Sequence, residues 1–173
     1  MFFEKLQKKL HRTCGTCTLC CQGYLKLVVR GQYIHQGNPC NYLSSNACSI
    51  YHERPSVCKE FKCLYLLDIS IPEWMKPTNS NVIIYFRIMN NIPILEVMEC
   101  GIPPSTEVLE WLSKKIEDKK ITDIVIKYNS KLYHVSTNKE HSIKVKDFVE
   151  KYGDTLSDVR EIPVFKERIK NLI

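Results

Sequence analysis

Downstream of residue 81, apolar residues gather in short runs rich in β-branched and aromatic side chains. VIIYFRIM (82–89) and IPILEVM (92–98) are separated by two asparagines, and ITDIVIKY (121–128) and KLYHVS (131–136) by an Asn-Ser pair. Such runs, joined by two turn-forming residues, predict two β-hairpins. Because Pro93 lacks the amide hydrogen that a central strand uses, we expect the second strand to lie at a sheet edge.

Other segments place apolar residues at helical spacing. The clearest is 106–118, where an apolar stripe ends in lysines, as the helix dipole favours. Weaker helices are expected around 144–152 and 163–172. At the N-terminus, a short amphipathic helix that leads into the first cysteines is predicted by Phe2, Phe3, Leu6 and Leu10.

Residues 10–70 show little apolar periodicity. Only YLKLVV (24–29) indicates a strand, the remainder is rich in turn-forming residues, and IPEWMKPTNSN (71–81) is typical of a connector. Such a segment buries too little apolar surface to fold alone, so metal ligation is the expected source of the missing stability. We therefore predict an α+β fold in which a loop-rich, metal-stabilised cysteine-cluster domain (10–70) packs on a small α+β region of two hairpins and helices (71–173).

The positive charge of the chain lies in its first part. Residues 1–65 hold nine of the 25 Lys and Arg but only three of the 19 Asp and Glu, whereas the remainder is balanced. A basic patch is one mark of nucleic-acid binding. These residues are scattered outside any recognisable motif, however, and metal-bound thiolates need cations nearby to offset their charge. We therefore expect charge balance at a metal site rather than a nucleic-acid partner.

The sequence also indicates a compartment. No apolar run approaches the roughly 20 residues that cross a bilayer. The first residues lack the apolar core and cleavage site of a signal peptide. We expect a cytoplasmic protein with no membrane partner. Thiols stay reduced in that compartment, so clustered cysteines favour metal binding or catalysis over disulfides.

Eight of the nine cysteines precede Leu64. The first three follow a C-x2-C-x2-C spacing, which lets ligands turn back onto one metal ion and also opens the bacterial ferredoxin signature, although the C-x3-C-P ending is missing. Cys20 and Cys21 are neighbours with diverging side chains, so we expect them to join two centres or one multinuclear centre. Eight thiolates would fill two four-thiolate sites. The predicted metal ligands are Cys14, Cys17, Cys20, Cys21, Cys40, Cys48, Cys58 and Cys63.

The two histidines between the cysteines and the ninth cysteine have simpler interpretations. His35 and His52 are expected on the surface or outside the ligand set. Cys100 stands far downstream of the other cysteines, and we expect it to be a small buried apolar residue. A disulfide framework is the alternative for eight cysteines, but the absence of an export signal argues against it.

These cysteines stand in a pattern that resembles a known family. CGTCTLCC (14–21), CNYL (40–43), CSIYHERPSVCKEF (48–61) and a further Cys63 are similar to the CxxCxxCC, or YkgJ-type, cysteine-cluster family. The resemblance covers about residues 10–65 and implies a zinc- or iron-chelating domain. It places metal ligands at Cys14, Cys17, Cys20, Cys21, Cys40, Cys48 and Cys58, and local spacing adds Cys63. Tyr51 and Arg54 match family positions that either orient the loop or offset thiolate charge.

Three functional hypotheses follow. The leading one is a protein that binds zinc or iron, including an iron–sulfur cluster, through the eight cysteines. The family also includes flagellin lysine N-methylases, so a protein-modifying enzyme that uses S-adenosylmethionine is an alternative by analogy, although no glycine-rich loop for that cofactor stands out. A nucleic-acid-associated module with structural zinc is the third. The sequence leaves the metal, any catalytic residues and any protein partner open.

Overall fold

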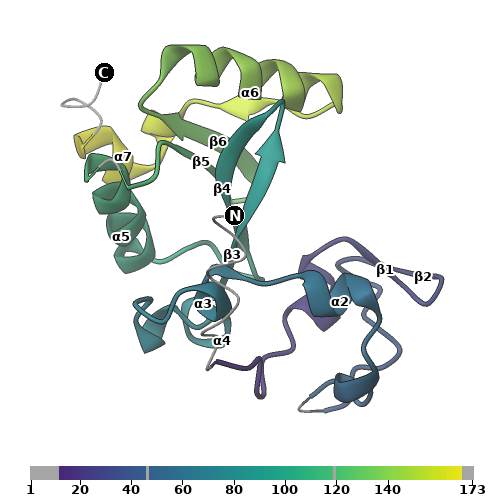
Figure 1. The fold of residues 1–173 in the computed structure, drawn as a ribbon. Helices are drawn as coiled ribbons and strands as arrows, with labels where there is room; N and C mark the ends of the chain where they lie inside the picture. Colours follow the sequence, from purple (N-terminus) through teal and green to yellow (C-terminus); the bar gives the residue numbers. More distant parts are fainter. Residues whose placement is uncertain (1–11, 46, 119, 169–173) are drawn as a thin grey trace. The chain divides into compact units, whose positions relative to one another are not determined.

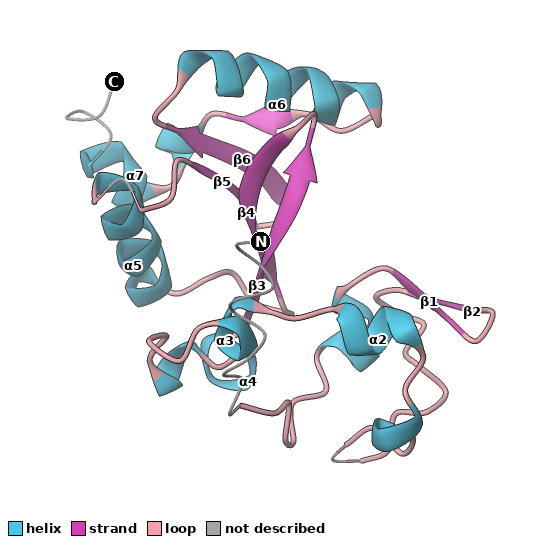
Figure 2. Ribbon diagram, viewed as in Figure 1, coloured by secondary structure: helices cyan, strands magenta, loops and turns pink. Residues whose placement is uncertain are grey.

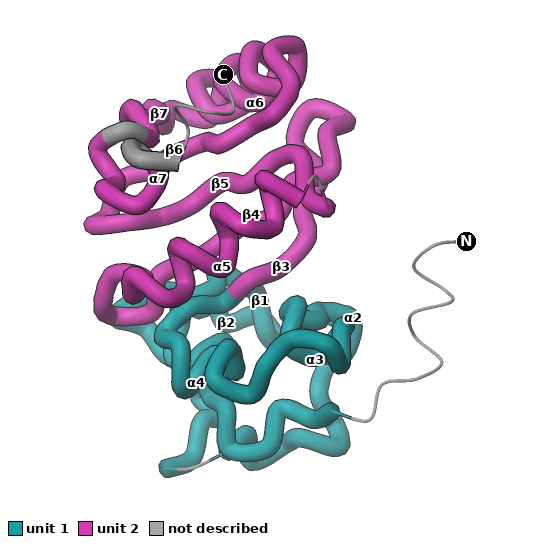
Figure 3. The backbone as a smooth tube through the Cα atoms, turned by 90° about the vertical axis from the view of Figure 1, so that its left-hand side faces the viewer, with its two compact units in different colours: residues 1–83 teal, residues 84–173 magenta. Residues whose placement is uncertain are grey.

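The structure is a computed structural model that describes residues 12–45, 47–118 and 120–168. It divides into two compact units, residues 1–83 (unit 1) and 84–173 (unit 2), coloured separately in Figure 3. The division expected near residue 70 therefore falls inside unit 1. The reason is that the expected connector, 71–81, forms two short helices and buries Ile71, Met75 and Pro77. The helix expected from Phe2 to Leu10 lies outside the described residues.

Unit 1 consists of short elements joined by turns (Figure 1). Strands β1 (Leu27–Val29) and β2 (Gln32–Ile34) pair as an antiparallel hairpin. The expected strand 24–29 begins only at Leu27, because Cys20–Tyr24 form a π-helical turn, η1. The remaining elements are η2 (Tyr51–Glu53), α2 (Ser56–Glu60), α3 (Leu64–Leu67), η3 (Glu73–Met75) and α4 (Pro77–Ser80).

Unit 2 is built on a five-stranded sheet in the order β3-β4-β5-β6-β7, whose first strand begins in the last two residues of unit 1. Its strands are β3 (Val82–Met89), β4 (Ile92–Glu99), β5 (Asp123–Tyr128), β6 (Lys131–Ser136) and β7 (Leu156–Ser157). The two predicted hairpins are both present, as β3–β4 and β5–β6. Each turns on two residues with positive φ, Asn90 with Asn91 and Asn129 with Ser130. That conformation matches the twist of hairpin strands, and Asn adopts it readily.

The prediction that β4 lies at the sheet edge is wrong. β4 is central, between β3 and β5, and it pairs in parallel with β5 from Leu95 to Val97. Pro93 is compatible with this position because it stands near the start of β4, before the pairing with β5 begins. The two edge strands of this sheet are β7 and β3, and β3 exposes Phe86 and Ile88.

Helices lie on both sides of the unit 2 sheet (Figure 2). On one side, α6 (Lys139–Lys151) buries Val145 and Val149 against Ile94 and Val125. On the other side lie α5 (Thr106–Glu117) and α7 (Pro163–Arg168), which contact each other. The helix expected at 106–118 is confirmed, while α6 begins before the expected 144–152 because the Asn138 side chain caps it. In the described residues, no helix has the length and apolar character needed to cross a membrane.

Candidate metal centre

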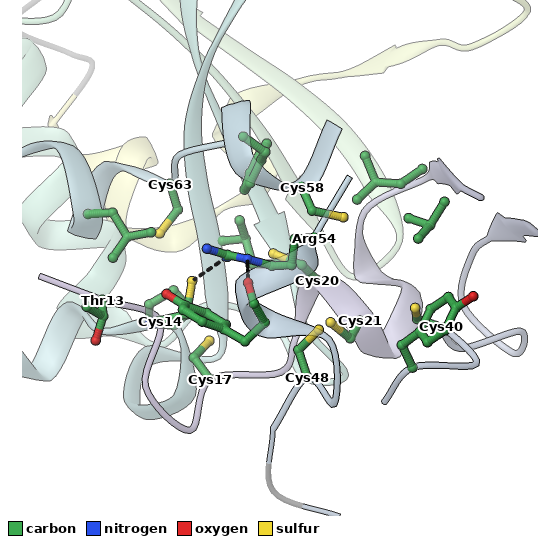
Figure 4. A pocket seen from close by; sticks show the side chains of 18 of the residues that line it. Thr13, Cys14, Cys17, Cys20, Cys21, Cys40, Cys48, Arg54, Cys58 and Cys63 are labelled. Carbon is green, nitrogen blue, oxygen red and sulfur yellow. Dashed lines mark hydrogen bonds between the residues drawn. The ribbon is translucent and has the colours of Figure 1, made fainter. Parts of the chain in front are cut away.

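A cavity of about 90 Å³ lies within unit 1 (Figure 4). All eight predicted ligands line it: Cys14, Cys17, Cys20, Cys21, Cys40, Cys48, Cys58 and Cys63. The ninth cysteine, Cys100, is not in the cavity wall; it is buried and belongs to unit 2. Folding thus brings cysteines from distant parts of unit 1 together around one cavity.

The run of four cysteines bends along the cavity wall through two turns. The Cys17 amide donates a hydrogen bond to the Cys14 carbonyl (2.9 Å), and Gly15 between them has a φ of 55°. Cys20 and Cys21 then begin η1. Successive residues of a helical turn do not face each other, so the two neighbouring thiols are directed to different parts of the cavity (Figure 4).

Gly23 allows η1 to approach the turn at residues 35–38. Its φ is 89°, a conformation that glycine adopts without strain. A Cβ atom at this position would lie 2.9 Å from the Gln36 backbone nitrogen and would overlap the His35 carbonyl group. Beside this contact, the Cys40 amide donates a hydrogen bond to the Cys21 carbonyl (2.8 Å). The close approach therefore positions Cys21 next to Cys40.

Cys48 and Cys58 reach the cavity from the chain that follows Cys40. The Leu43 amide donates to the Cys40 carbonyl (2.9 Å), and Leu43 pairs with Cys48 in an isolated β-bridge. Cys58 is part of α2. Cys21 and Cys58 both pack against a buried apolar cluster made of Val29, Ile34 and Cys40.

Cys63 is the N-cap residue of α3. The segment that enters the cysteine run is fixed to this helix by Arg12. Its Nη1 donates to the backbone carbonyls of Tyr65 and Asp68, both at 3.2 Å, and its guanidinium lies 4.2 Å from the centroid of the Tyr65 ring. The same contacts therefore bring the chain around Cys14 close to Cys63.

Burial is the main cause that raises the pKa of the Cys20 thiol well above its usual value. Neighbouring thiolates add to the shift, in the order Cys63, Cys17, Cys14 and last Cys21. Burial also raises the pKa of Cys63 to about 11, with Cys14 and Cys17 contributing. These thiols are therefore close enough to disfavour one another's ionisation.

Cys21 has a different set of electrostatic neighbours. Burial raises the pKa of its thiol to about 12, and the thiolates of Cys48, Cys40, Cys58 and last Cys14 add to the effect. Burial also raises the pKa of Cys58, followed by Cys40 and Cys48. Without a cation to neutralise them, the thiols on both sides of the Cys20–Cys21 peptide bond favour their protonated form.

Two cations lie beside the thiols. Arg54 donates from Nη1 toward the Cys14 Sγ (4.0 Å) and from Nε to the Tyr51 carbonyl (2.7 Å). The Arg54 guanidinium also stacks over the Tyr51 ring, 3.7 Å from its centroid. Lys76 offsets part of the rise that burial produces in the pKa of Cys17. Tyr51 thus positions Arg54, whose charge also offsets part of the rise that burial produces in the pKa of Cys58.

Among the described residues of unit 1, His35 and His52 are the histidines, and neither lines the cavity. His35 contacts the Gln36 carbonyl through Nδ1 (2.8 Å), and the exposed His52 packs edge-on against the Tyr51 ring. The thiols are therefore the soft donors in the cavity wall, which also contains the hydroxyl-bearing residues Thr13, Tyr42, Tyr51 and Tyr65. Lys76 lines the cavity but was not predicted as a site residue, because it lies in a segment interpreted as a connector.

The described residues contain no group of three or more His, Cys, Asp or Glu side chains arranged to hold a metal ion as they stand. The eight thiols thus face a common cavity without converging on one point, and ligation requires their side chains to rotate toward shared positions. The donors themselves suit a metal. None of these eight cysteines forms a disulfide, and thiolates bind soft or borderline ions such as zinc and the iron of iron–sulfur clusters.

A second cluster of titratable side chains lies in unit 2. Asp123 is fully buried and contacts His134 Nε2 (3.1 Å) and His141 Nδ1 (2.6 Å). Burial alone would raise the pKa of Asp123, but hydrogen bonds from His134, Ser136, His141 and Thr122 outweigh it and hold that pKa well below its usual value. No motif in the sequence indicated this cluster, because its members lie on two strands and a helix.

Comparison with known proteins adds no relative to this description. The chain matches no family model, no curated protein and no solved structure. The site therefore rests on the residues and geometry of this chain.

Proposed function

We propose that this protein binds zinc or iron through the eight cysteines of the unit 1 cavity. The observation that carries the proposal is their convergence on one cavity from separate stretches of the chain, while Cys100 lies apart. Cysteines selected only as small apolar residues would be distributed between the two units. The presence of eight cysteines around one cavity, and of Cys100 in the other unit, supports a shared chemical role for the eight.

The burial of the thiols supports the same proposal. Buried thiols with raised pKa values are poor nucleophiles, so a catalytic role for an isolated cysteine among them is disfavoured. A bound cation would reverse the situation, because it stabilises thiolates and lets several of them share one charge. Zinc would supply a structural crosslink at such a site, whereas an iron–sulfur cluster would supply electron transfer.

The arginines of the first 65 residues favour charge balance over nucleic-acid binding. Arg12 is held by the Tyr65 and Asp68 carbonyls, Arg30 by the Glu53 carbonyl, and Arg54 faces Cys14. These guanidinium groups serve internal contacts instead of forming a stripe for phosphates. Within the described residues, no observation favours the alternatives of protein modification or a nucleic-acid module.

Elemental analysis of untagged protein, purified anaerobically without chelators, tests the proposal. We expect stoichiometric zinc or iron, and the visible spectrum distinguishes the two: a brown protein with bound sulfide indicates a cluster, whereas a colourless one indicates zinc. Cys100→Ser is the control and should carry the same amount of metal. Protein that folds fully without metal, and takes up neither zinc nor iron when reduced, would refute the proposal.

A further inference from the structure

The eight cysteines of the cavity fall into two sets of neighbours. The first quartet is Cys14, Cys17, Cys20 and Cys63, and the second quartet is Cys21, Cys40, Cys48 and Cys58. Figure 4 shows Cys14, Cys17 and Cys63 toward one end of the cavity and the second quartet toward the other, with Cys20 between them.

Backbone contacts assemble the first quartet. The turn between Cys14 and Cys17 is closed by the hydrogen bond between their backbones (2.9 Å). Arg12, two residues before Cys14, is bound to the helix that Cys63 caps. Cys20 follows Cys17 at the C-x2-C spacing that lets two ligands turn back onto one metal ion. These contacts join the two ends of the first quartet, although Cys63 is distant in sequence.

Separate contacts assemble the second quartet. The Cys40 amide binds the Cys21 carbonyl (2.8 Å), and the bridge between Leu43 and Cys48 folds the loop back toward Cys40. Cys21 and Cys58 pack on the same apolar cluster as Cys40. The second quartet is thus held together by contacts that do not involve the first.

We infer that the two quartets form two separate four-thiolate metal sites that adjoin at the Cys20–Cys21 peptide bond. This inference rests on the proposed function and assigns its ligands. Two thiols on successive residues of η1 diverge, so each can serve a different ion. Four thiolates complete a tetrahedral shell around zinc, and the same number holds an iron–sulfur cluster.

Cadmium-113 NMR on the reduced full-length wild-type protein tests the assignment directly, with cadmium alone as the probe. We expect two cadmium resonances, one correlated with the β-protons of the first quartet and the other with those of the second. A cysteine whose protons correlate with both resonances, or a resonance that mixes the quartets, would overturn the inference. If no cadmium binds, the proposed function itself fails.

Paired variants provide an independent measurement by native mass spectrometry of zinc-loaded protein. Cys17→Ser/Cys63→Ser removes two ligands of the first quartet, and Cys40→Ser/Cys58→Ser removes two of the second. We expect each double variant to lose one of two metal equivalents. Cys17→Ser/Cys58→Ser should lose both. If either within-quartet variant loses all its metal while the wild-type NMR shows cysteines shared between resonances, the thiols form one multinuclear centre and the inference is wrong.

Discussion

Replacing Gly23 with alanine tests how the backbone sets the distance between Cys21 and Cys40. Gly23 lies two residues beyond Cys21, and an added Cβ would overlap the carbonyl group of His35. Backbone atoms cannot rotate away as a side chain can, so η1 and the turn at 35–38 would have to separate. The hydrogen bond between the Cys40 amide and the Cys21 carbonyl (2.8 Å) lies in the path of that movement.

The expected magnitude combines two effects. Placing a non-glycine residue at a φ of 89° costs about 1–2 kcal/mol, and forcing packed atoms apart costs about 1–3 kcal/mol more. Gly37→Ala is the matched control. Gly37 has a similar φ of 92°, but an added Cβ meets no atom within 4 Å, so only the first effect applies. We therefore expect Gly23→Ala to reduce the free energy of unfolding of unit 1 by about 2–5 kcal/mol and Gly37→Ala by about 1–2 kcal/mol.

Tryptophan fluorescence can isolate the unit concerned. Unit 1 contains Trp74 and unit 2 contains Trp111, so guanidinium unfolding in a Trp111→Phe background reports on unit 1. Competition with a chelator measures the metal affinity of the second quartet. We expect this affinity to be at least tenfold lower in Gly23→Ala, because about 1.4 kcal/mol corresponds to a factor of ten. If both glycine variants lose the same stability, the close approach at His35 does not constrain the fold, and the reasoning is refuted.

Three further predictions concern single side chains. Arg54→Met removes the donor to Cys14 and should weaken metal binding about tenfold in chelator competition, and Arg54→Lys should recover part of the loss. Equal metal affinities of Arg54→Met and the wild type would show that the guanidinium does not act on the site. Cys100→Ser should leave metal content unchanged and reduce stability by about 1 kcal/mol in denaturant unfolding, and a loss of metal would place Cys100 in the site. Because the pKa of Asp123 is lowered by folding, its stabilisation is full above the unfolded-state value of about 4 and disappears as pH falls through the folded-state value. Asp123→Asn should therefore cost about 3 kcal/mol near neutral pH and flatten the acid dependence of unfolding measured by circular dichroism; an unchanged pH profile would exclude the carboxylate as the cause.

The sequence predicted unit 2 well where local rules decide its structure. Two asparagines, or an asparagine and a serine, between β-rich runs specify tight hairpins, and both hairpins form. Strand order is not a local property. Pro93 indicated an edge, but the crossover through α5 places β5 beside β4 and makes β4 central. A single proline near the start of a strand cannot reveal which strand will pair with the residues after it.

The candidate site was likewise predictable from the sequence only in part. Composition and spacing identified the eight cysteines, because clustered thiols have few structural explanations, and all eight line the cavity. The supporting residues were harder to predict. Lys76 lies in a segment without periodicity, and the contact between Arg54 and Cys14 joins residues far apart in the sequence. Such contacts depend on how the loops fold back, which neither propensity nor motif spacing encodes.

The thiol pKa values connect the folding of unit 1 with its proposed chemistry. Burial raises the pKa of Cys63 to about 11 and that of Cys21 to about 12, so at neutral pH both remain protonated unless a cation stabilises the thiolates. A metal ion must therefore displace protons to bind, and its apparent affinity increases with pH. The mutual repulsion of crowded thiolates, which opposes ionisation without metal, is cancelled when a cation lies between them. We therefore propose that this loop-rich unit, with its short helices and one small hairpin, gains stability when the same thiols bind a metal ion.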